Sequence, residues 1–227
     1  MKSSSPKLVL LNGPRHCGKD TAAAYVAQEM NACHFKFSSP IKEAVKTIFG
    51  LSSAEVDYLE SIKTTPTSLL LGKSYIDVQL SFSESWAKQF FCQDIFGHLA
   101  LRRLRKITDT TEEDLFVSSD SGFACEAWPS ILEFFGAANT LLVQIEREGK
   151  TFAGDSRSYI ELPGVETVRI HNNGDILEYQ RRMVSMINGW LSSRHGDTGC
   201  SDGFCPMPSV RQGPPENGFT EMFKPVN

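Results

Sequence analysis

Short apolar runs alternate with helical patterns along most of the chain. Five segments have the character of short buried strands, at residues 7–12, 34–37, 115–120, 141–147 and 166–170. Apolar positions recur at helical spacing over residues 21–30, 126–135 and 176–191. Short strands that alternate with helices are typical of a parallel sheet covered on both faces. The pattern therefore predicts a three-layer α/β fold with a parallel sheet of about five strands.

The middle of the chain is less regular. Ser38 and Ser39 stand before Pro40 and an apolar-periodic segment, which is typical of a helix start. Residues 52–80 have no clear periodicity, so we assign no elements there. Residues 83–106 carry aromatic and aliphatic side chains at mostly helical spacing, which predicts one long helix or two short ones. We expect a helical insertion over about residues 41–106.

The last part of the chain changes in character. In the predicted helix 176–191, one face collects the large apolar side chains Ile176, Tyr179, Met183, Met186, Ile187 and Trp190. Residues 192–227 are rich in Gly, Pro and Ser, with little apolar periodicity. We therefore expect one domain over residues 1–191, followed by a tail that is mobile or packs as an extended arm.

Composition and charge narrow the class of protein. The chain has 227 residues, 41% of them hydrophobic, and a formal net charge of −4. No overall basic field draws such a chain to nucleic acid, so we expect no stable nucleic-acid partner. The longest apolar runs are too short to span a bilayer, and the N-terminus has no apolar signal region. We expect a cytoplasmic protein without a membrane partner.

Six cysteines are scattered along the chain, which is large enough not to need disulfide bonds. We expect reduced thiols. Cys200 and Cys205 are the one close pair, and no second pair stands at the spacing of zinc ligands.

The strongest motif follows the first predicted strand. Residues 13–19 read GPRHCGK, which fits the spacing G-x-x-x-x-G-K between a strand and a helix. Gly13 and Gly18 let backbone N–H groups turn toward phosphate oxygens, and Lys19 adds a mobile charge for the β- and γ-phosphates. Arg15 lies within the same loop. This context predicts an ATP-binding loop, and the alternative is a glycine-rich turn that only connects a strand to a helix.

Asp20 occupies the position where such loops normally carry a hydroxyl ligand for Mg²⁺. A carboxylate also serves as a magnesium ligand, directly or through water, and Thr21 follows with a hydroxyl. The alternative is that Asp20 only stabilises the first turn of the helix through its dipole. Asp20 and Thr21 are therefore candidate metal ligands.

Four landmarks occur in order: GKDT, FSSPIKEAV, VSSDSGF and IHNNGDILEYQRRM. Together they resemble the deoxynucleoside monophosphate kinases of tailed bacteriophages, within the nucleoside monophosphate kinase group of P-loop proteins. The resemblance spans about residues 8–191, and an aspartate after GK is normal in that family. It implies a P-loop NTPase-type fold and transfer of phosphate from ATP, with Mg²⁺, to a (deoxy)nucleoside monophosphate. It also implies a supply of precursors for phage DNA synthesis in the host cytoplasm.

The resemblance assigns the acceptor to the second strand–helix unit, in the insertion, where Ser38 and Lys42 are candidate binding residues. A lysine on a helix is also commonly a solvated surface residue. Asp120 ends a predicted strand, where ligands bind in open α/β sheets, and is a candidate to hold Mg²⁺ or to orient the acceptor. The alternative for Asp120 is the N-cap of the helix that follows.

Arginines supply the remaining candidate cations. The family has a basic residue shortly after the aspartate, whereas this chain has Ser121 and Gly122. Of the arginines near the end of residues 83–106, Arg103 is our candidate for the acceptor phosphate, although basic residues also favour a helix C-terminus without a ligand. Arg147 and Arg157 flank a segment that the resemblance identifies as a lid, at about residues 146–160. The alternative is a surface loop with two solvated arginines.

Three other functions remain open at this point: a P-loop kinase acting on modified bases in DNA, a dephospho-coenzyme A kinase, and a non-catalytic nucleotide-binding module. The base and sugar of the acceptor depend on residues 52–80. The exposed part of the aromatic segment 83–106 offers a face for a homodimer.

Overall fold

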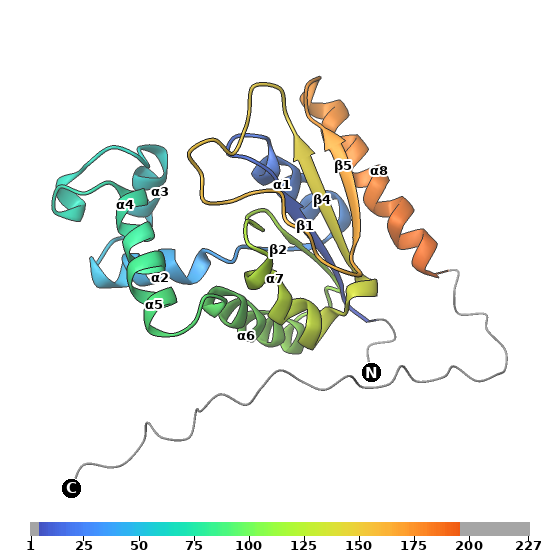
Figure 1. Cartoon of the computed structure of the whole chain (residues 1–227), viewed down its shortest axis with the longest axis horizontal. Helices are drawn as coiled ribbons and strands as arrows, with labels where there is room; N and C mark the ends of the chain where they lie inside the picture. The colour runs from blue at the N-terminus through green and yellow to red at the C-terminus, as the bar shows by residue number, and fades with distance from the viewer. Residues whose placement is uncertain (1–4, 196–227) are drawn as a thin grey trace, which may run out of the picture.

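A five-stranded parallel sheet forms the centre of the structure, a computed structural model that describes residues 5–195 (Figure 1). Its strands are β1 (Lys7–Asn12), β2 (Cys33–Phe35), β3 (Leu115–Ser118), β4 (Thr140–Glu146) and β5 (Glu166–His171). They lie in the order β2-β3-β1-β4-β5, and every neighbouring pair is parallel. The chain moves to opposite sides of β1 for β3 and β4, so a ligand-binding crevice is expected at the carboxyl end of β1.

Helices cover both faces of this sheet. On one face, α1 (Lys19–Met30) and α8 (Ile176–His195) pack over a core that includes Val9, Leu11 and Met183. On the other face lie α6 (Ile95–Thr110) and α7 (Ala124–Ser130), which runs on into the π-helical turn Ile131–Phe135. A 3₁₀ turn, Ala137–Asn139, then leads into β4. Residues 8–11 have no solvent exposure, because they alternate between the two cores.

A helical arm extends from the sheet between β2 and α6 (Figure 1). It contains α2 (Ser39–Ile48), α3 (Ser53–Ser61), the 3₁₀ turn Ser68–Leu70, α4 (Tyr75–Leu80), the π-helical segment Ser81–Ala87 and α5 (Lys88–Phe90). The arm has a core of its own, formed by Val45, Leu51, Leu59, Leu70, Tyr75 and Val78. We call this segment, from Ser39 to Phe90, the arm.

The predicted fold class is confirmed, and each of the five predicted strands is present, with ends that differ from the prediction by at most two residues. The segment 83–106 is helical in two parts. The π-helical segment and α5 continue α4 without a gap as far as Phe90, and α6 starts at Ile95 after a break. The predicted insertion 41–106 is divided accordingly. Its first part forms the arm, whereas α6 packs on the sheet through Phe96, Ala100 and Leu104.

Two further predictions need correction. Ile176 lies on the exposed side of α8, because it starts the helix beyond the edge of the core that Tyr179 and Met183 fill. The helix also continues to His195, so the first residues of the predicted tail 192–227 are helical. The rest of that tail, with Cys200 and Cys205, lies outside the described residues.

The cysteines within the described residues form no disulfide bonds. Cys17, Cys33, Cys92 and Cys125 are free thiols, as predicted for this part of the chain. Within residues 5–195, no helix has the length and apolar content needed to cross a membrane.

Trp86, Phe90 and Phe91 are exposed at the end of the arm, so the homodimer face stays a prediction.

Candidate active site

The loop between β1 and α1, residues 13–18, which we call the phosphate loop, has the backbone conformation that the motif requires. A Cβ atom at Gly13 would lie 2.6 Å from the carbonyl oxygen of Ile145, so only glycine fits against β4. Gly18 has a φ of +102°, and a Cβ atom there would lie 2.4 Å from Nδ2 of Asn172. His16 is also left-handed, with a φ of 61°. Both glycines of the motif therefore stand where the chain permits no other residue without strain.

Lys19 folds back onto the loop that precedes it. Its ammonium group donates hydrogen bonds to the carbonyl oxygens of Gly13 (2.7 Å) and Pro14 (2.6 Å). The side chain is buried, and burial lowers the pKa of Lys19 below its ordinary value. A third partner is Sγ of Cys17, at 3.6 Å. Phosphate oxygens can replace all three as acceptors for the ammonium group.

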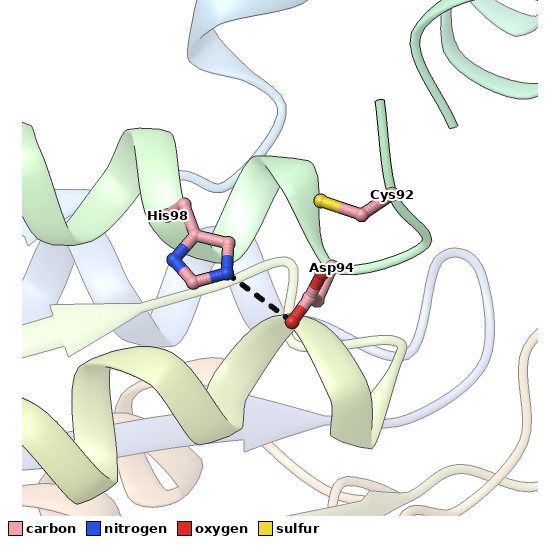
Figure 2. Close-up of side chains that lie close together, drawn as sticks. All are labelled: Cys92, Asp94 and His98. Atoms are coloured by element: carbon pink, nitrogen blue, oxygen red, sulfur yellow. Dashed lines mark ion pairs between the residues drawn. The ribbon is translucent and has the colours of Figure 1, made fainter. Parts of the chain in front are cut away.

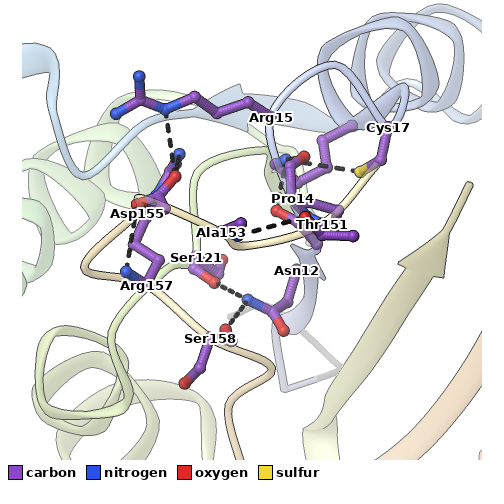
Figure 3. A network of polar contacts seen from close by, with 12 residues as sticks. Asn12, Pro14, Arg15, Cys17, Ser121, Thr151, Ala153, Asp155, Arg157 and Ser158 are labelled. Carbon is purple, nitrogen blue, oxygen red and sulfur yellow. Dashed lines mark hydrogen bonds and ion pairs between the residues drawn. The ribbon is translucent and has the colours of Figure 1, made fainter. Parts of the chain in front are cut away.

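The segment predicted as a lid, at about residues 146–160 and called the lid below, brings arginines to the same loop (Figure 3). Arg147 follows β4 and donates from Nη1 to the carbonyl oxygen of His16 (3.2 Å). Asp155 accepts from Nε of Arg15 in the phosphate loop (3.1 Å) and from Nε of Arg157 (2.9 Å), with a further short contact to Nη2 of Arg157. The hydrogen bonds from Arg157 hold the pKa of the Asp155 carboxyl far below its usual range. The predicted arginines Arg15, Arg147 and Arg157 thus gather around one loop.

Asn12 joins the phosphate loop to two other loops, and we did not predict it. Its Nδ2 donates to the carbonyl oxygens of Ser121 (2.7 Å) and Ser158 (3.2 Å) (Figure 3). Its Oδ1 accepts from the backbone N–H of Ile160 (3.1 Å). The side chain is buried, with 1% of its surface exposed. A polar residue at the end of an apolar strand, directly before Gly13, was the available signal.

The turn between β5 and α8 supports the other end of the phosphate loop. Nδ2 of Asn172 donates to the carbonyl oxygen of Cys17 (2.9 Å), and the Tyr179 hydroxyl donates to that of Gly18 (3.3 Å). Burial raises the pKa of Tyr179 far above its ordinary value, so its hydroxyl stays protonated as a donor. The landmark IHNNGD therefore acts structurally, as a brace for the phosphate loop.

Asp20 lies at the open side of the loop. Oδ1 accepts hydrogen bonds from Nζ of Lys36 and from the hydroxyl of Ser119 (2.8 Å), which in turn contacts Nε2 of His34 (3.0 Å). Burial alone would raise the pKa of Asp20, but these donors outweigh it and lower the pKa. The side chain is still 71% exposed, and Thr21 is exposed too. Lys36, which follows β2, was not predicted as a site residue.

Asp120 holds the start of the arm. Its carboxylate accepts from the backbone N–H groups of Phe37 and Ser38 (2.9 Å each), from the Ser38 hydroxyl (2.7 Å) and from the Ser118 hydroxyl (3.1 Å). Four donors thus surround the carboxylate that we expected to hold Mg²⁺ or the acceptor. The alternative, an N-cap for the following helix, is wrong: the N-cap of α7 is Phe123, and no side chain caps it.

The candidate acceptor residues make contacts within and next to the arm. The Ser38 hydroxyl is engaged by Asp120, and Lys42 of α2 forms an ion pair with Glu60 of α3. Arg103 of α6 pairs with Glu43 of α2, with Nη1 2.9 Å from Oε1, in an exposed position. These contacts tie helices together, and none of them joins Lys42 or Arg103 to the phosphate loop.

A buried ion pair links the arm to α7. Nζ of Lys88 lies 3.1 Å from Oε1 of Glu126 and 2.8 Å from Oε1 of Glu84, and 4.1 Å above the centre of the Phe123 ring. Burial raises the pKa of Glu126 to about 7, because the charge of Lys88 compensates only part of the lost solvation. The sequence offered no signal for this pair, since its members are far apart along the chain.

Known proteins resemble this chain in part. A family model described as deoxynucleotide monophosphate kinase matches residues 7–77, which include the phosphate loop and most of the arm. A protein of Acanthamoeba polyphaga mimivirus, with the provisional name deoxynucleotide monophosphate kinase, is 24% identical over 191 residues. That match covers 80% of this chain and 96% of the viral protein.

Two further matches are shorter or more distant. The deoxynucleotide monophosphate kinase of Enterobacteria phage T4 is 35% identical over 52 residues, 23% of this chain and 22% of that protein. A crystal structure of a gluconokinase from Sinorhizobium meliloti 1021 superposes with a TM-score of 0.45 at 10% identity. That superposition covers 86% of this chain and 98% of the gluconokinase.

Proposed function

We propose that the protein is a kinase that transfers the γ-phosphoryl group of ATP to a (deoxy)nucleoside monophosphate. The observation that carries the proposal is the convergence of cations on one phosphate-binding loop. Lys19 bonds to carbonyl oxygens of that loop, Arg147 bonds to another, and Arg157 reaches it through Asp155 and Arg15. The positive charge of Arg157 also contributes to the lowered pKa of Lys19, so the two cations face a common region.

This set of groups suits phosphoryl transfer. An oxygen of the acceptor phosphate forms a bond to the γ-phosphorus, while the bond from that phosphorus to the bridging oxygen breaks and ADP leaves. The chain then needs to hold two anions in line, offset their repulsion and exclude water, and it needs no covalent intermediate. Lys19 and the lid arginines would offset the charge, and the lid, which Asn12 ties to β1, would exclude water.

The first turn of α1 fits a Mg²⁺ ion. Asp20 and Thr21 present hard oxygen donors at an exposed position beside the phosphate loop, which is the ligand class that Mg²⁺ prefers. When bound, Mg²⁺ neutralises part of the phosphate charge. Lys36 would leave Asp20 as the ion binds. Because Asp120 is surrounded by four donors, we propose that it positions the arm and is not a direct metal ligand.

The arm is the proposed place of the acceptor. Asp120 fixes the first turn of α2 to the carboxyl end of β3, at the same edge of the sheet as the phosphate loop. Ser38 and Lys42 lie on that first turn, so an acceptor phosphate there would face the γ-phosphate. The family match over residues 7–77 and the names of the viral relatives support a deoxynucleotide as the acceptor. Such an activity would supply precursors for viral DNA synthesis.

The test is an ATP-consumption assay with Mg²⁺ against a panel of ribo- and deoxynucleoside monophosphates, dephospho-coenzyme A and modified duplex DNA. Products are identified by chromatography, so that a nucleoside diphosphate is seen directly. We expect turnover on one or a few deoxynucleotides and a loss of at least ~100-fold in Lys19→Met, which removes the mobile charge but keeps a long apolar stem. Unfolding curves of Lys19→Met, recorded alongside, check that the variant is folded.

Each other outcome replaces the proposal with a defined alternative. Turnover only on dephospho-coenzyme A or on modified DNA names a different acceptor class. ATP binding without turnover on any member of the panel contradicts the proposed activity and favours a nucleotide-binding module. Lys42→Met serves as the matched lysine variant in the arm, and it should raise the KM of the acceptor more than that of ATP.

A further inference from the structure

Three side chains that are typical metal ligands gather at the start of α6, where the arm rejoins the sheet. Figure 2 shows Cys92, Asp94 and His98 turned toward one another, and their ligand atoms all lie within 4.8 Å. Nε2 of His98 is 3.3 Å from Oδ2 of Asp94, and the same carboxylate accepts a hydrogen bond from the Cys92 thiol. In the proposed function, none of these residues has a role.

Asp94 supplies a second, independent observation. It is the N-cap residue of α6, where an aspartate normally accepts a hydrogen bond from a backbone N–H of the first turn. Its side chain makes no such bond. The carboxylate faces Cys92 and His98 instead. Its oxygens therefore lie near the sulfur of Cys92 and a ring nitrogen of His98, and they do not cap the helix.

Another thiol lies next to this group. Cys125 is on α7, and its Sγ is 3.9 Å from the carbonyl oxygen of Gln93, the residue between Cys92 and Asp94. The two helices approach closely there, because a Cβ atom at Gly97 of α6 would lie 2.3 Å from the carbonyl oxygen of Glu126. Cys125 is outside the group whose ligand atoms lie within 4.8 Å, but it is the thiol of α7 that neighbours the segment between Cys92 and Asp94.

From this geometry we propose that Cys92, Asp94 and His98 form a binding site for a divalent transition-metal ion, Zn²⁺, with Cys125 or water as the fourth ligand. One sulfur, one oxygen and one nitrogen donor suit a borderline-soft ion and do not suit Mg²⁺ or Ca²⁺. A thiolate and a carboxylate together offset the charge of the ion, and the Cys92 proton leaves to solvent when it binds. The site would fix the junction of the arm and α6, and it does not depend on the proposed function.

Cobalt is the probe for this site, because Co²⁺ takes the same ligands and reports on them by absorption. The full-length protein is freed of metal with a chelator and titrated with Co²⁺, and then with Zn²⁺. We expect a sulfur-to-cobalt charge-transfer band and tetrahedral d–d bands that saturate near one equivalent and vanish as Zn²⁺ displaces the probe. Cys92→Ser should abolish the charge-transfer band if water is the fourth ligand, and His98→Ala should weaken binding more than roughly tenfold.

Two controls keep the result specific. Cys33→Ser removes a partly buried thiol of β2, and the double variant Cys200→Ser/Cys205→Ser removes the close pair of the tail; both should retain the bands. Cys92→Ser/Cys125→Ser tests whether Cys125 is the fourth ligand. No band in the unaltered protein at one equivalent overturns the proposal. So does a band that survives in Cys92→Ser/Cys125→Ser, or one that disappears in the tail variant.

Discussion

Arg15 of the phosphate loop and Asp155 of the lid are 140 positions apart and form an ion pair, with Nε 3.1 Å from Oδ2. The same carboxylate holds Arg157 through two side-chain contacts. Nucleotide phosphates would need these two arginines to offset their charge. In the structure, both guanidinium groups are already paired with the Asp155 carboxylate. Binding of ATP would then have to displace a carboxylate that is already well bonded.

Asp155→Asn tests this competition. The amide keeps the shape of the side chain but removes the charge that holds Arg15 and Arg157. We expect ATP to bind about three- to tenfold more tightly, measured by calorimetry without acceptor, while the free energy of unfolding falls by about 1 kcal/mol. Glu148→Gln, which alters an exposed carboxylate of the same lid, is the control and should leave both quantities unchanged. Unchanged or weaker ATP binding in Asp155→Asn would show that the carboxylate does not compete.

Asn12→Ala should be one of the more destabilising polar substitutions near the site. It leaves the carbonyl oxygens of Ser121 and Ser158 and the N–H of Ile160 without a partner in a buried place. We expect a loss of about 2–4 kcal/mol in the free energy of unfolding, measured in urea. Asn173→Ala, which removes an exposed acceptor for the N–H of Glu148, should cost less than about 1 kcal/mol. Equal losses in the two variants would contradict a special role for Asn12.

Asp20 and Lys36 form a pair that we expect to control the Mg²⁺ requirement. Asp20→Asn removes the charged oxygen donor, so the Mg²⁺ concentration for half-maximal activity should rise about fivefold or more. Lys36→Met removes the cation that competes for Asp20, so this concentration should fall. In the double variant, loss of Lys36 should have no further effect. A fall that persists without Asp20 would rule out competition at this carboxylate.

Lys88→Met should destabilise the protein in a manner that depends on pH. Because the pKa of Glu126 rises from 4.5 to about 7 on folding, the folded protein holds this proton more tightly than the unfolded chain. Its contribution to stability is present below pH 4.5 and is lost as the pH rises through about 7. Without Lys88 the pKa of Glu126 rises further. We expect a loss of about 3–5 kcal/mol at pH 8, and a clearly smaller loss at pH 5.

The control for that prediction is Lys88→Met/Glu126→Gln, which leaves no buried carboxylate to protonate. Its unfolding free energy should differ little between pH 5 and pH 8, apart from changes that the unaltered protein also shows at other groups. If Lys88→Met loses the same stability at both pH values, Glu126 is not the titrating group.

The strands and the phosphate loop could be predicted because their signals are local. Residues 8–11 are buried on both faces of the sheet, so they form a continuous apolar run with no polar interruption. Gly13 and Gly18 mark places where no Cβ fits, and such places are visible in the sequence as glycines at fixed spacing. These features need no knowledge of distant residues.

The helices between residues 52 and 80 were missed, although their starts carry local signals. Ser52 and Glu55 form a capping box at the start of α3, and Ser74 caps α4 through the N–H of Asp77. The apolar periodicity is weak because these helices cover only the small core of the arm, which needs few buried side chains from each. Here the caps were better indicators than the apolar pattern.

The partners of Asp120 were not predictable from its surroundings in the chain. Its position before a helix suggested an N-cap for that helix. In the folded chain β2 pairs with β3, with Phe35 opposite Ser118, and this register brings Ser38 beside Asp120. Asn12 carried a local signal as a polar residue at the end of an apolar strand, but its partners come from distant loops. Lys36 meets Asp20 of α1 only in the folded chain.

Because the arm has a core of its own, it forms a cassette, a unit that can change while the rest of the molecule keeps its contacts. Asp120 fastens one end at Ser38, the Lys88–Glu126 ion pair joins the other end to α7, and the side chains of α2, α3 and α4 between them pack mainly on one another. Substitutions inside the cassette need not disturb Lys19 or Asn12, whose contacts lie elsewhere. An arm grafted from a related protein between these two joints would leave the contacts of the phosphate loop in place, so the acceptor that we propose for the arm could change while the proposed transfer stays the same.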